Sequence, residues 1–477
     1  MKSLFFQRVE IDFKSRREVV ASHLPAHTAE QGDHLIYLAG HVLHERPYTD
    51  VELPFRQESN FLYISGVQDI PGSHFIYSLK TKKSFLFLPA ISDDDAVWIG
   101  PQMPMDKVQQ KYQMDVVKST AELKSTIAEL QPACIHHLPD VAIGVLGVPK
   151  SCESNVNLLK LALAEARMVK SAPELHLMRL ANKASSDAHA ELMRFVKQAT
   201  TSRMLGDGQS HFSEQEATAK WYAETLTRGC QFQAYLPIVA YGRNAATLHY
   251  NRNDALIPYN GDSFLLVDAG AEFQGYASDI TRTYPINGKF DTPQKRGLYG
   301  IVLKAQMSVI EKIRAGVQWE DLHRHAAEII CQGLLDLGVL KSNGSSLHEL
   351  CWKKFVVQRF FPHGLGHLIG IDVHDVGGYP PGVERIQEPG TRYLRMRREL
   401  KPGYVVTVEP GCYFVDVLIE AALKDPVQSV HIDRDVLEQY RPLGGVRIED
   451  CVVVTASGYE NLTSAPKTIE DIEKVMA

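Results

Sequence analysis

Acidic residues in strand-like segments constrain this chain more than any other feature of its sequence. Glu409 ends the apolar run Val405–Val408, and Glu449 stands in the segment 446–450, where strand alternation places it on the same face as Arg447. Burying an ionised carboxylate in such a place costs free energy unless the group is paired or bound to a cation. The chain is therefore expected to fold around a compensating positive charge.

A second pair of carboxylates flanks a predicted hairpin. Asp268 ends the apolar run Leu265–Val267, and a turn signal at residues 273–275 separates it from Asp279. If the hairpin is centred between residues 273 and 274, the two aspartates lie directly opposite each other, with Cβ atoms about 4.5–5.5 Å apart. Two ionised carboxylates at that distance repel each other unless one is protonated or a cation lies between them.

Three imidazoles lie close together in the sequence, at both ends of the pentapeptide His363-Gly-Leu-Gly-His367 and at His374. An H-x-x-x-H spacing normally indicates two ligands on one face of a helix. The glycines within and after the pentapeptide oppose that interpretation, because glycine weakens a helix interior. The alternating pattern over residues 369–374 instead predicts a glycine-rich bend that enters a β-strand.

The carboxylates and one histidine together predict a metal centre. Four carboxylates match the charge of two divalent cations, and an oxygen-rich ligand set favours Mn²⁺, with Co²⁺ or Zn²⁺ as alternatives. Two such ions can activate water and stabilise a tetrahedral intermediate. The set consists of Asp268, Asp279, Glu409, Glu449 and one histidine.

Length, charge and cysteine usage limit the class of protein. A chain of 477 residues exceeds one ordinary core, so two domains are expected, and a formal net charge of −6 argues against a general binder of nucleic acid or anionic membranes. The seven cysteines are scattered and never form a CxxC motif, which favours reduced thiols in the cytoplasm. No stretch approaches the ~20 apolar residues that span a bilayer, and the early charges indicate no signal peptide.

The pattern of apolar runs predicts an α/β domain over residues 1–165 and an α+β domain over residues 166–477, with the boundary near residues 155–172. In the first domain, strands of one sheet are predicted at residues 35–38, 61–64, 75–77 and 85–88, and helices at 106–112 and 120–130. In the second, helices are predicted at 293–316 and 320–337, and strands at 237–240, 264–267, 405–408, 446–448 and 451–454. The second domain carries nearly all of the candidate chemistry.

These motifs resemble the metal site of the Xaa-Pro peptidases, the prolidases and aminopeptidases P of peptidase family M24B. The matching segments are Asp268-Ala-Gly, Ala277-Ser-Asp279-Ile-Thr, His363-Gly-Leu-Gly-His367, Val373-His374-Asp375, Thr407-Val-Glu409-Pro-Gly and Arg447-Ile-Glu449-Asp450. The resemblance covers most of the chain. It implies a creatinase-like α/β N-terminal domain followed by an α+β "pita-bread" metallopeptidase domain.

The resemblance also implies a role for each matched residue. Two metal ions per subunit would be bound by Asp268, Asp279, His367, Glu409 and Glu449. Glu409 would in addition transfer a proton, and His363 and His374 would stabilise the oxyanion of the tetrahedral intermediate.

Substrate contacts are implied as well. They would involve His249, His374, Arg395 and Arg447, and Arg447 would also orient the neighbouring carboxylates. The substrate would be a peptide with proline in the second position. Members of the family are commonly homodimers, and Arg56 is the candidate for a contact with the partner's active site.

Two specificities remain open. Residues 370–395 resemble prolidase, in which the arginine at the position of Arg395 meets the free carboxylate of an Xaa-Pro dipeptide, although Arg397 and Arg398 lie nearby. Residues 269–283 are closer to aminopeptidase P, which removes the first residue from longer peptides. The sequence favours prolidase, with aminopeptidase P as the alternative. Metal-free relatives are disfavoured because all five ligands are present, and methionine aminopeptidase is disfavoured by the large first domain.

Overall fold

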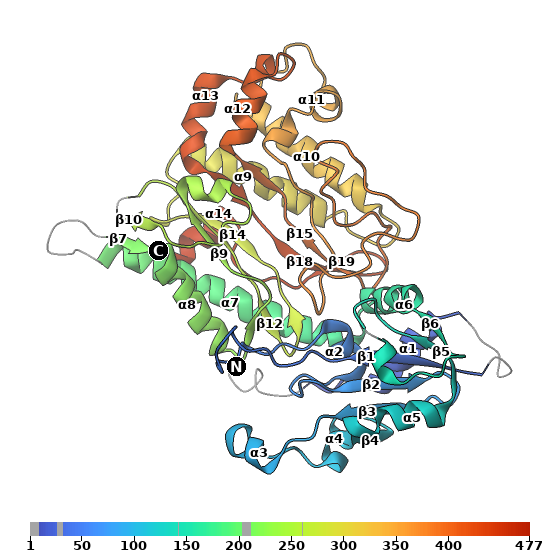
Figure 1. Cartoon of the computed structure of the whole chain (residues 1–477). Helices are drawn as coiled ribbons and strands as arrows, with labels where there is room; N and C mark the ends of the chain where they lie inside the picture. Colours follow the sequence, from blue (N-terminus) through green and yellow to red (C-terminus); the bar gives the residue numbers. More distant parts are fainter. Residues whose placement is uncertain (1–8, 26–31, 142, 203–210, 260) are drawn as a thin grey trace. The chain divides into compact units, whose positions relative to one another are not determined.

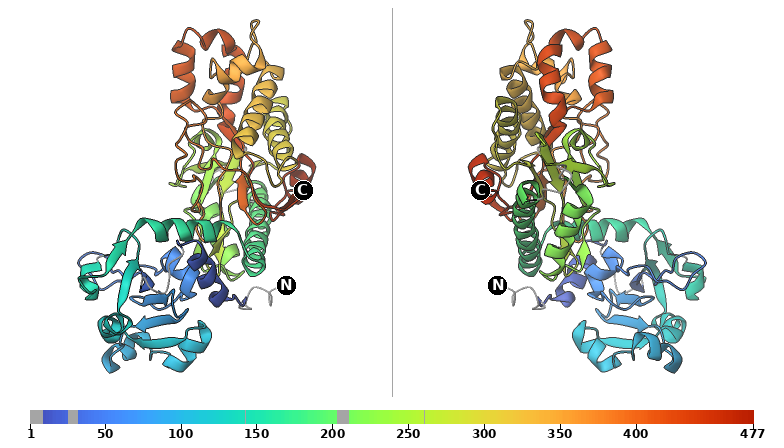
Figure 2. Two further views of the ribbon diagram at one scale, coloured as in Figure 1. Left: turned by 90° about the vertical axis from the view of Figure 1, so that its right-hand side faces the viewer. Right: turned by 90° about the vertical axis from the view of Figure 1, so that its left-hand side faces the viewer.

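A computed structural model describes residues 9–25, 32–141, 143–202, 211–259 and 261–477 (Figures 1 and 2). Residues 1–8, where the sequence predicts no signal peptide, lie outside the described part. The chain divides into two compact units, residues Glu10–Arg167 and residues Met168–Ala477, and Val9 belongs to the second. Among the described helices, none has the length and apolar character needed to cross a bilayer.

The first unit is built on a mixed sheet with the strand order β4-β3-β2-β1-β5-β6. Its strands are β1 (Asp33–Ala39), β2 (His74–Ser78), β3 (Ser84–Leu88), β4 (Val116–Ser119), β5 (Pro132–His136) and β6 (Glu153–Asn155). Its helices are α1 (Phe13–Ser22), α2 (Ser59–Ser65), α3 (Asp93–Ile99), α4 (Met105–Lys111), α5 (Leu123–Leu130) and α6 (Asn157–Met168). One core of this unit contains Leu35 and Ile135 from adjacent strands and Ile127 from α5. Helix α4 confirms the predicted helix at 106–112, and a 3-10 turn at Thr120–Glu122 followed by α5 accounts for the predicted helix at 120–130.

The apolar run Phe61–Ile64 forms part of helix α2, so the predicted strand at residues 61–64 is wrong. Glu58 begins this helix by accepting hydrogen bonds from the backbone N–H groups of the first turn, and Gly66 ends it with φ of 76°. Every residue of the run is buried. A short run that is buried on all sides shows no periodicity, so the sequence pattern alone does not separate helix from strand.

The second unit combines small antiparallel sheets with helices that cover them (Figure 1). Its strands are β7 (His211–Ser213), β8 (Phe232–Gln233), β9 (Ile238–Tyr241), β10 (Leu256–Pro258), β11 (Phe264–Asp268), β12 (Ala271–Phe273), β13 (Tyr276–Ala277), β14 (Thr281–Pro285), β15 (Val405–Val408), β16 (Gly411–Tyr413), β17 (Gly445–Arg447), β18 (Asp450–Val454) and β19 (Tyr459–Asn461). The sheets run β14-β11-β9, β13-β12-β8, β15-β18-β19, β16-β17 and β10-β7.

The helices of this unit are α7 (Ala172–Ser202), α8 (Glu214–Leu226), α9 (Pro293–Ile310), α10 (Trp319–Asp336), α11 (Leu347–Trp352), α12 (Asp416–Lys424), α13 (Arg434–Tyr440) and α14 (Ile469–Val475). Helices α9 and α10 lie side by side, as both figures show. The largest buried apolar cluster includes Trp221 of α8, Val267 of β11 and Ile330 of α10, so it joins the helices to the sheet that carries Asp268.

The register of the hairpin differs from the prediction by two residues. Phe273 pairs with Tyr276, and Asp268 therefore lies opposite Thr281 rather than opposite Asp279. The turn is made by Gln274 and Gly275, both of which have positive φ. A shift of two residues preserves the face on which a side chain points. The two aspartates consequently still approach each other, as diagonal rather than opposed neighbours.

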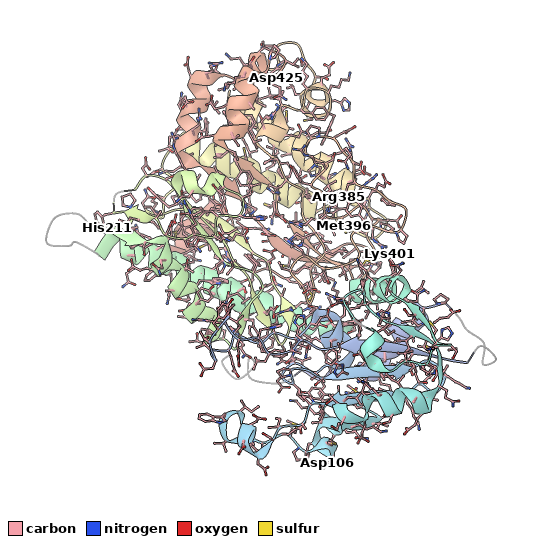
Figure 3. All side chains as sticks on the ribbon, viewed as in Figure 1. Asp106, His211, Arg385, Met396, Lys401 and Asp425 are labelled. Carbon is pink, nitrogen blue, oxygen red and sulfur yellow. The ribbon has the colours of Figure 1, made fainter. Side chains whose placement is uncertain are left out.

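The strand predicted after the histidine-containing pentapeptide is absent: residues 360–404, all of which the structure describes, contain no helix and no strand. Only an isolated bridge joins Leu368 to Val406 of β15. Gly366 lies so close to β15 that a Cβ atom would approach the carbonyl oxygen of Thr407 to 2.1 Å. The segment thus follows the edge of another strand through irregular backbone; Arg385, Met396 and Lys401, labelled in Figure 3, lie on it.

Candidate metal and catalytic site

Five segments of the second unit bring the predicted ligands together. Asp268 ends β11, Asp279 lies between β13 and β14, Glu409 follows β15, Glu449 lies between β17 and β18, and His367 lies in the irregular segment. Ligand atoms of Asp279, His367 and Glu449 all lie within 4.8 Å of one another. Nε2 of His367 is 3.4 Å from a carboxylate oxygen of Asp279 and 3.4 Å from one of Glu409.

Tyr235 joins the two aspartates, and sequence reasoning missed it. Its hydroxyl lies 2.6 Å from Oδ1 of Asp268 and 2.6 Å from Oδ1 of Asp279. A hydroxyl carries a single proton, so it can donate to only one of these oxygens. The other carboxylate must be protonated or neutralised in another way. A lone tyrosine in the mixed polar and apolar segment before β9 gives no sequence signal for this position.

One carboxylate oxygen in the site has no hydrogen-bond partner. Oε2 of Glu449 accepts a hydrogen bond from Thr281 Oγ1 at 2.7 Å, but Oε1 is buried and unpaired within the described part of the chain. A buried oxygen without a donor costs roughly 1–3 kcal/mol or more when it is charged. A cation bound at this oxygen would remove that cost, which is the first indication that the site fits a metal ion.

The charges of the site are also unbalanced. Arg447 donates to Oδ2 of Asp268 at 2.6 Å and so neutralises one carboxylate, while its other nitrogens donate to Thr281 and Tyr413. Three carboxylates remain, at Asp279, Glu409 and Glu449. Oxygen ligands with one imidazole and a surplus of negative charge form a donor set that fits divalent cations.

The unbalanced charge raises the pKa of these carboxyl groups. Burial, reinforced by Asp268, raises the pKa of Asp279 well above its usual value, and burial raises the pKa of Glu449 in the same way. Burial, together with the nearby Glu449, raises the pKa of Glu409 to about 8. Burial lowers the pKa of His367, so its imidazole is neutral and able to bind a metal ion.

The other predicted histidines line the same cavity. Nε2 of His363 lies 2.9 Å from the hydroxyl of Tyr413, and burial, with Arg447 nearby, lowers the pKa of His363 to about 3. The ring of His374 lies 4.4 Å from that of His367, centroid to centroid. Burial, with His367 nearby, lowers the pKa of His374 to about 3. His249 is exposed and lines the cavity wall.

The cavity in front of the carboxylates has a volume of about 1390 Å³ and is lined in part by arginines. Arg395 lines it, together with Arg385 and Arg392. In contrast, Arg397 pairs with Glu320 at 3.2 Å, and Arg398 donates to the backbone oxygen of Gly377. Of the three arginines that the sequence left open, only Arg395 therefore lines the cavity.

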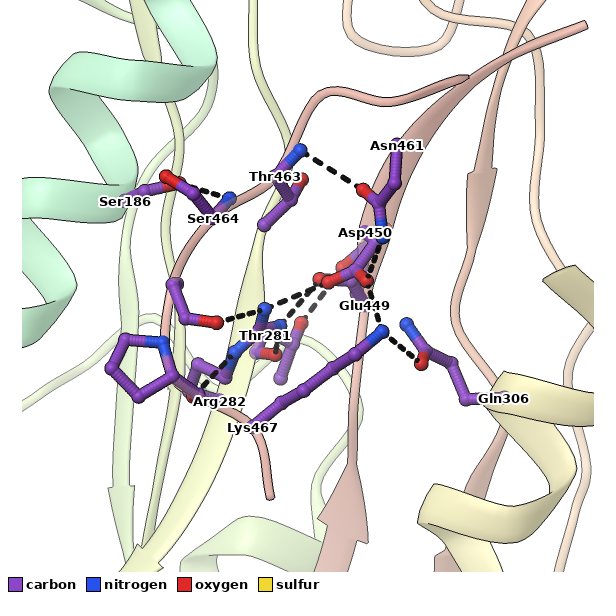
Figure 4. A network of polar contacts seen from close by, with 12 residues as sticks. Ser186, Thr281, Arg282, Gln306, Glu449, Asp450, Asn461, Thr463, Ser464 and Lys467 are labelled. Atoms are coloured by element: carbon purple, nitrogen blue, oxygen red, sulfur yellow. Dashed lines mark hydrogen bonds and ion pairs between the residues drawn. The ribbon is translucent and has the colours of Figure 1, made fainter. Parts of the chain in front are cut away.

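A buried polar network holds the backbone that carries Glu449 (Figure 4). The guanidinium of Arg282 donates to the carbonyl oxygens of Thr281 and Glu449 at 2.9 and 2.7 Å, and to Asp450 at 2.7 Å. Lys467 also contacts Asp450, at 2.5 Å. The two cations hold the pKa of Asp450 well below its usual range despite its burial. Asp450 is thus an ionised group that pairs with Arg282 and Lys467 and is not a further metal ligand.

Comparison with known sequences identifies both units. Residues 176–456 match Metallopeptidase family M24, and residues 13–136 match the N-terminal domain of aminopeptidase P. A "Probable Xaa-Pro aminopeptidase PEPP" of Paracoccidioides brasiliensis strain Pb03 is 40% identical over 449 residues, which cover 92% of each chain. A "Probable Xaa-Pro aminopeptidase pepP" of Aspergillus clavatus is 39% identical over 452 residues, which cover 93% of each chain.

Solved structures agree with these matches. The aminopeptidase PepP of Pseudomonas aeruginosa superimposes with a TM-score of 0.79 at 28% identity, covering 98% of this chain and 99% of the other. A zinc-substituted aminopeptidase P of Escherichia coli in complex with product superimposes with a TM-score of 0.77 at 27% identity, covering 98% of each chain. The predicted fold class, an N-terminal α/β domain followed by a pita-bread domain, is confirmed.

Proposed function

This chain belongs to metallopeptidase family M24 and is an Xaa-Pro peptidase, and on that premise we propose that it is an Xaa-Pro aminopeptidase. It would remove the first residue from peptides in which proline is second. The observation that carries the proposal is the convergence of Asp279, His367 and Glu449, with Asp268 and Glu409 alongside, in the lining of a large cavity.

The relatives support the aminopeptidase better than the dipeptidase that the sequence favours. The curated relatives and the solved structures reported above are all called aminopeptidases. The cavity volume of about 1390 Å³ points the same way, since pockets for small ligands usually measure roughly 300–1,000 Å³. A dipeptide would leave much of this space unfilled, whereas a longer peptide would extend into it.

The metal ligands are proposed to be Asp268, Asp279, His367, Glu409 and Glu449, and they would hold two divalent cations. We propose Mn²⁺, because carboxylates dominate the donor set, with Co²⁺ and Zn²⁺ as alternatives. When bound, the ions supply an activated water at neutral pH and Lewis-acid stabilisation of negative charge.

The side chains of the site transfer the proton, stabilise the oxyanion and hold the substrate. Glu409 accepts a proton from the attacking water and delivers it to the prolyl nitrogen, which leaves as a secondary amine. His363 and His374 face the developing oxyanion. Arg447 keeps Asp268 in place through its hydrogen bond at 2.6 Å. His249 and Arg395 contact the substrate from the cavity wall.

The decisive experiment compares two substrates with the Mn²⁺-loaded protein. We expect efficient release of arginine from the tripeptide Arg-Pro-Pro, with a higher kcat/KM than for the dipeptide Gly-Pro. Cleavage of Gly-Pro alone would establish a prolidase instead. Cleavage of neither substrate by the loaded protein would contradict both assignments.

Three further properties are proposed. The domain boundary lies near residue 165, between the α/β domain and the catalytic domain. The protein acts in the cytoplasm, in keeping with seven cysteines of which none forms a disulfide in the described chain. It forms a homodimer, in which Arg56 is the candidate for a contact with the partner subunit. In the single chain, Arg56 donates a hydrogen bond to Ser59 Oγ at 3.1 Å. To contact the partner subunit, the Arg56 side chain would have to break this hydrogen bond.

A further inference from the structure

Two adjacent strands of the first unit place three nitrogen and sulfur ligands on one face of the sheet. His34 of β1 lies directly opposite Cys134 of β5 in the parallel ladder, and His136 follows Cys134 on the same face, two residues along the strand. One ligand atom from each of the three side chains lies within 4.8 Å of the other two. None of these residues belongs to the catalytic site described above.

The spacing of the two imidazoles suits a tetrahedral metal ion. Nδ1 of His34 lies 3.2 Å from Nε2 of His136. Two nitrogens bound to zinc at 2.0–2.1 Å in tetrahedral geometry are about 3.3 Å apart. The same distance also fits a hydrogen bond between two neutral imidazoles. Metal binding by the thiol of Cys134 would distinguish a metal site from such a hydrogen bond.

The cluster is largely buried, but it can be reached from solvent. Cys134 and His136 are only 5% and 3% exposed, whereas His34 is half-buried and offers an approach from solvent. The intervening residues Leu35 and Ile135 point to the opposite face, into the apolar core.

We propose that His34, Cys134 and His136 form a binding site for a Zn²⁺ ion. Three protein ligands leave one position of the tetrahedron open. Glu153 lies directly across from Cys134 in the β5–β6 ladder, on the same face, and is the nearest candidate for that position. A thiolate with two imidazoles selects zinc over Mn²⁺, whereas the carboxylate-rich catalytic site has the opposite preference. The two sites of one chain would therefore bind different metals.

The test is a Co²⁺ titration of the metal-free full-length protein, because a cobalt–thiolate bond gives a charge-transfer absorption in the near ultraviolet. None of the proposed catalytic ligands is a cysteine, so Co²⁺ bound at the catalytic site does not contribute to this band. We expect the band to reach the amplitude of a single cobalt–thiolate site per chain, and to be displaced by Zn²⁺ but not by Mn²⁺. Cys134→Ser should abolish it, and the matched variant Cys152→Ser should retain it.

A second variant tests whether a loss of metal binding reflects a loss of folding. His34→Asn changes a half-buried residue and should weaken Co²⁺ binding at this site while the far-ultraviolet circular dichroism stays unchanged. Absence of a thiolate band at excess Co²⁺ would overturn the proposal and favour a simple hydrogen bond between the imidazoles. A band that persists in Cys134→Ser would overturn it as well, because the thiolate would then come from elsewhere.

Discussion

Arg447 and Asp268 form a buried ion pair in which Nη2 of the arginine donates to Oδ2 of the aspartate across 2.6 Å. The same guanidinium also donates to the hydroxyls of Thr281 and Tyr413, at 3.1 and 2.8 Å. One planar group therefore fixes a proposed metal ligand and two neighbouring side chains at once. A lysine could not make these three contacts in one geometry.

Replacing Arg447 with lysine is expected to lower kcat/KM by roughly 10–100-fold, the effect typical of groups that orient metal ligands. The loss arises because Asp268 keeps a positive neighbour but loses its fixed orientation. Steady-state kinetics on Arg-Pro-Pro measures it. The matched control is Arg397→Lys, which alters a pair with Glu320 outside the cavity lining and should leave kcat/KM within about twofold. Equal losses in the two variants would contradict the role of Arg447.

Tyr235→Phe should destabilise the metal-free protein more than the metal-loaded protein. The variant removes a hydroxyl at 2.6 Å from both Asp268 and Asp279, and a hydrogen bond to a charged group contributes about 1.5–3 kcal/mol. Bound cations would take over part of this compensation. Urea unfolding with EDTA and with Mn²⁺ measures the difference, and an equal loss of unfolding free energy in both conditions would contradict it.

The stability of the metal-free protein should fall as the pH rises between about 4.5 and 8. The unfolded chain releases the proton of Glu409 near the ordinary value of 4.5, whereas the folded protein keeps it until about 8. A raised pKa in the folded state thus stabilises it at low pH, and the contribution is lost as the pH rises through the folded pKa. Asp279 and Glu449 act in the same direction.

Mn²⁺ replaces these protons, so its stabilising effect should grow over the same pH range. Melting temperatures with EDTA and with Mn²⁺ at several pH values measure both trends. A stabilisation by Mn²⁺ that does not change with pH would show that the carboxylates are already ionised in the metal-free protein.

Gly366→Ala should lower both stability and activity. Its Cβ atom would lie 2.1 Å from the carbonyl oxygen of Thr407, and the resulting shift would move His367. Overpacking of this kind costs about 1–3 kcal/mol. Thermal unfolding and kcat/KM measure the two losses. Gly300→Ala is the control, because its Cβ atom would meet nothing within 4 Å on helix α9. A fully active Gly366→Ala variant would show that β15 tolerates the displacement.

Arg395→Ala should distinguish the two peptide lengths. If Arg395 meets the terminal carboxylate of a dipeptide, its loss should reduce cleavage of Gly-Pro by roughly tenfold or more. Cleavage of Arg-Pro-Pro should change less, because its carboxylate lies one residue further along. Arg398→Ala is the control, since that side chain donates to Gly377 instead of lining the cavity. Equal losses for both peptides would remove Arg395 from dipeptide recognition.

The sequence by itself determined which side chains could form the metal centre. Asp268, Glu409 and Glu449 stand in strand-like segments where a carboxylate is costly, and the flanking motifs are short and local. Local patterns of this kind can be recognised without knowing which distant segments come into contact. Helices were also predicted at residues 106–112 and 293–316, and the structure has α4 at Met105–Lys111 and α9 at Pro293–Ile310, which begins with Thr292 as N-cap and a proline in its first turn.

Only the tertiary structure decided what depends on contacts between distant segments. Tyr235 reaches the aspartates from a separate stretch of chain, and the run Phe61–Ile64 forms a helix that its uniformly apolar pattern does not distinguish from a strand. The hairpin register was set by the positive φ of Gln274 and Gly275, and the backbone after His363 was set by β15. The position of Tyr235 and the path after His363 depend on contacts between distant segments, which form only once the chain has folded, whereas the hairpin register depends on the backbone conformation of its two turn residues.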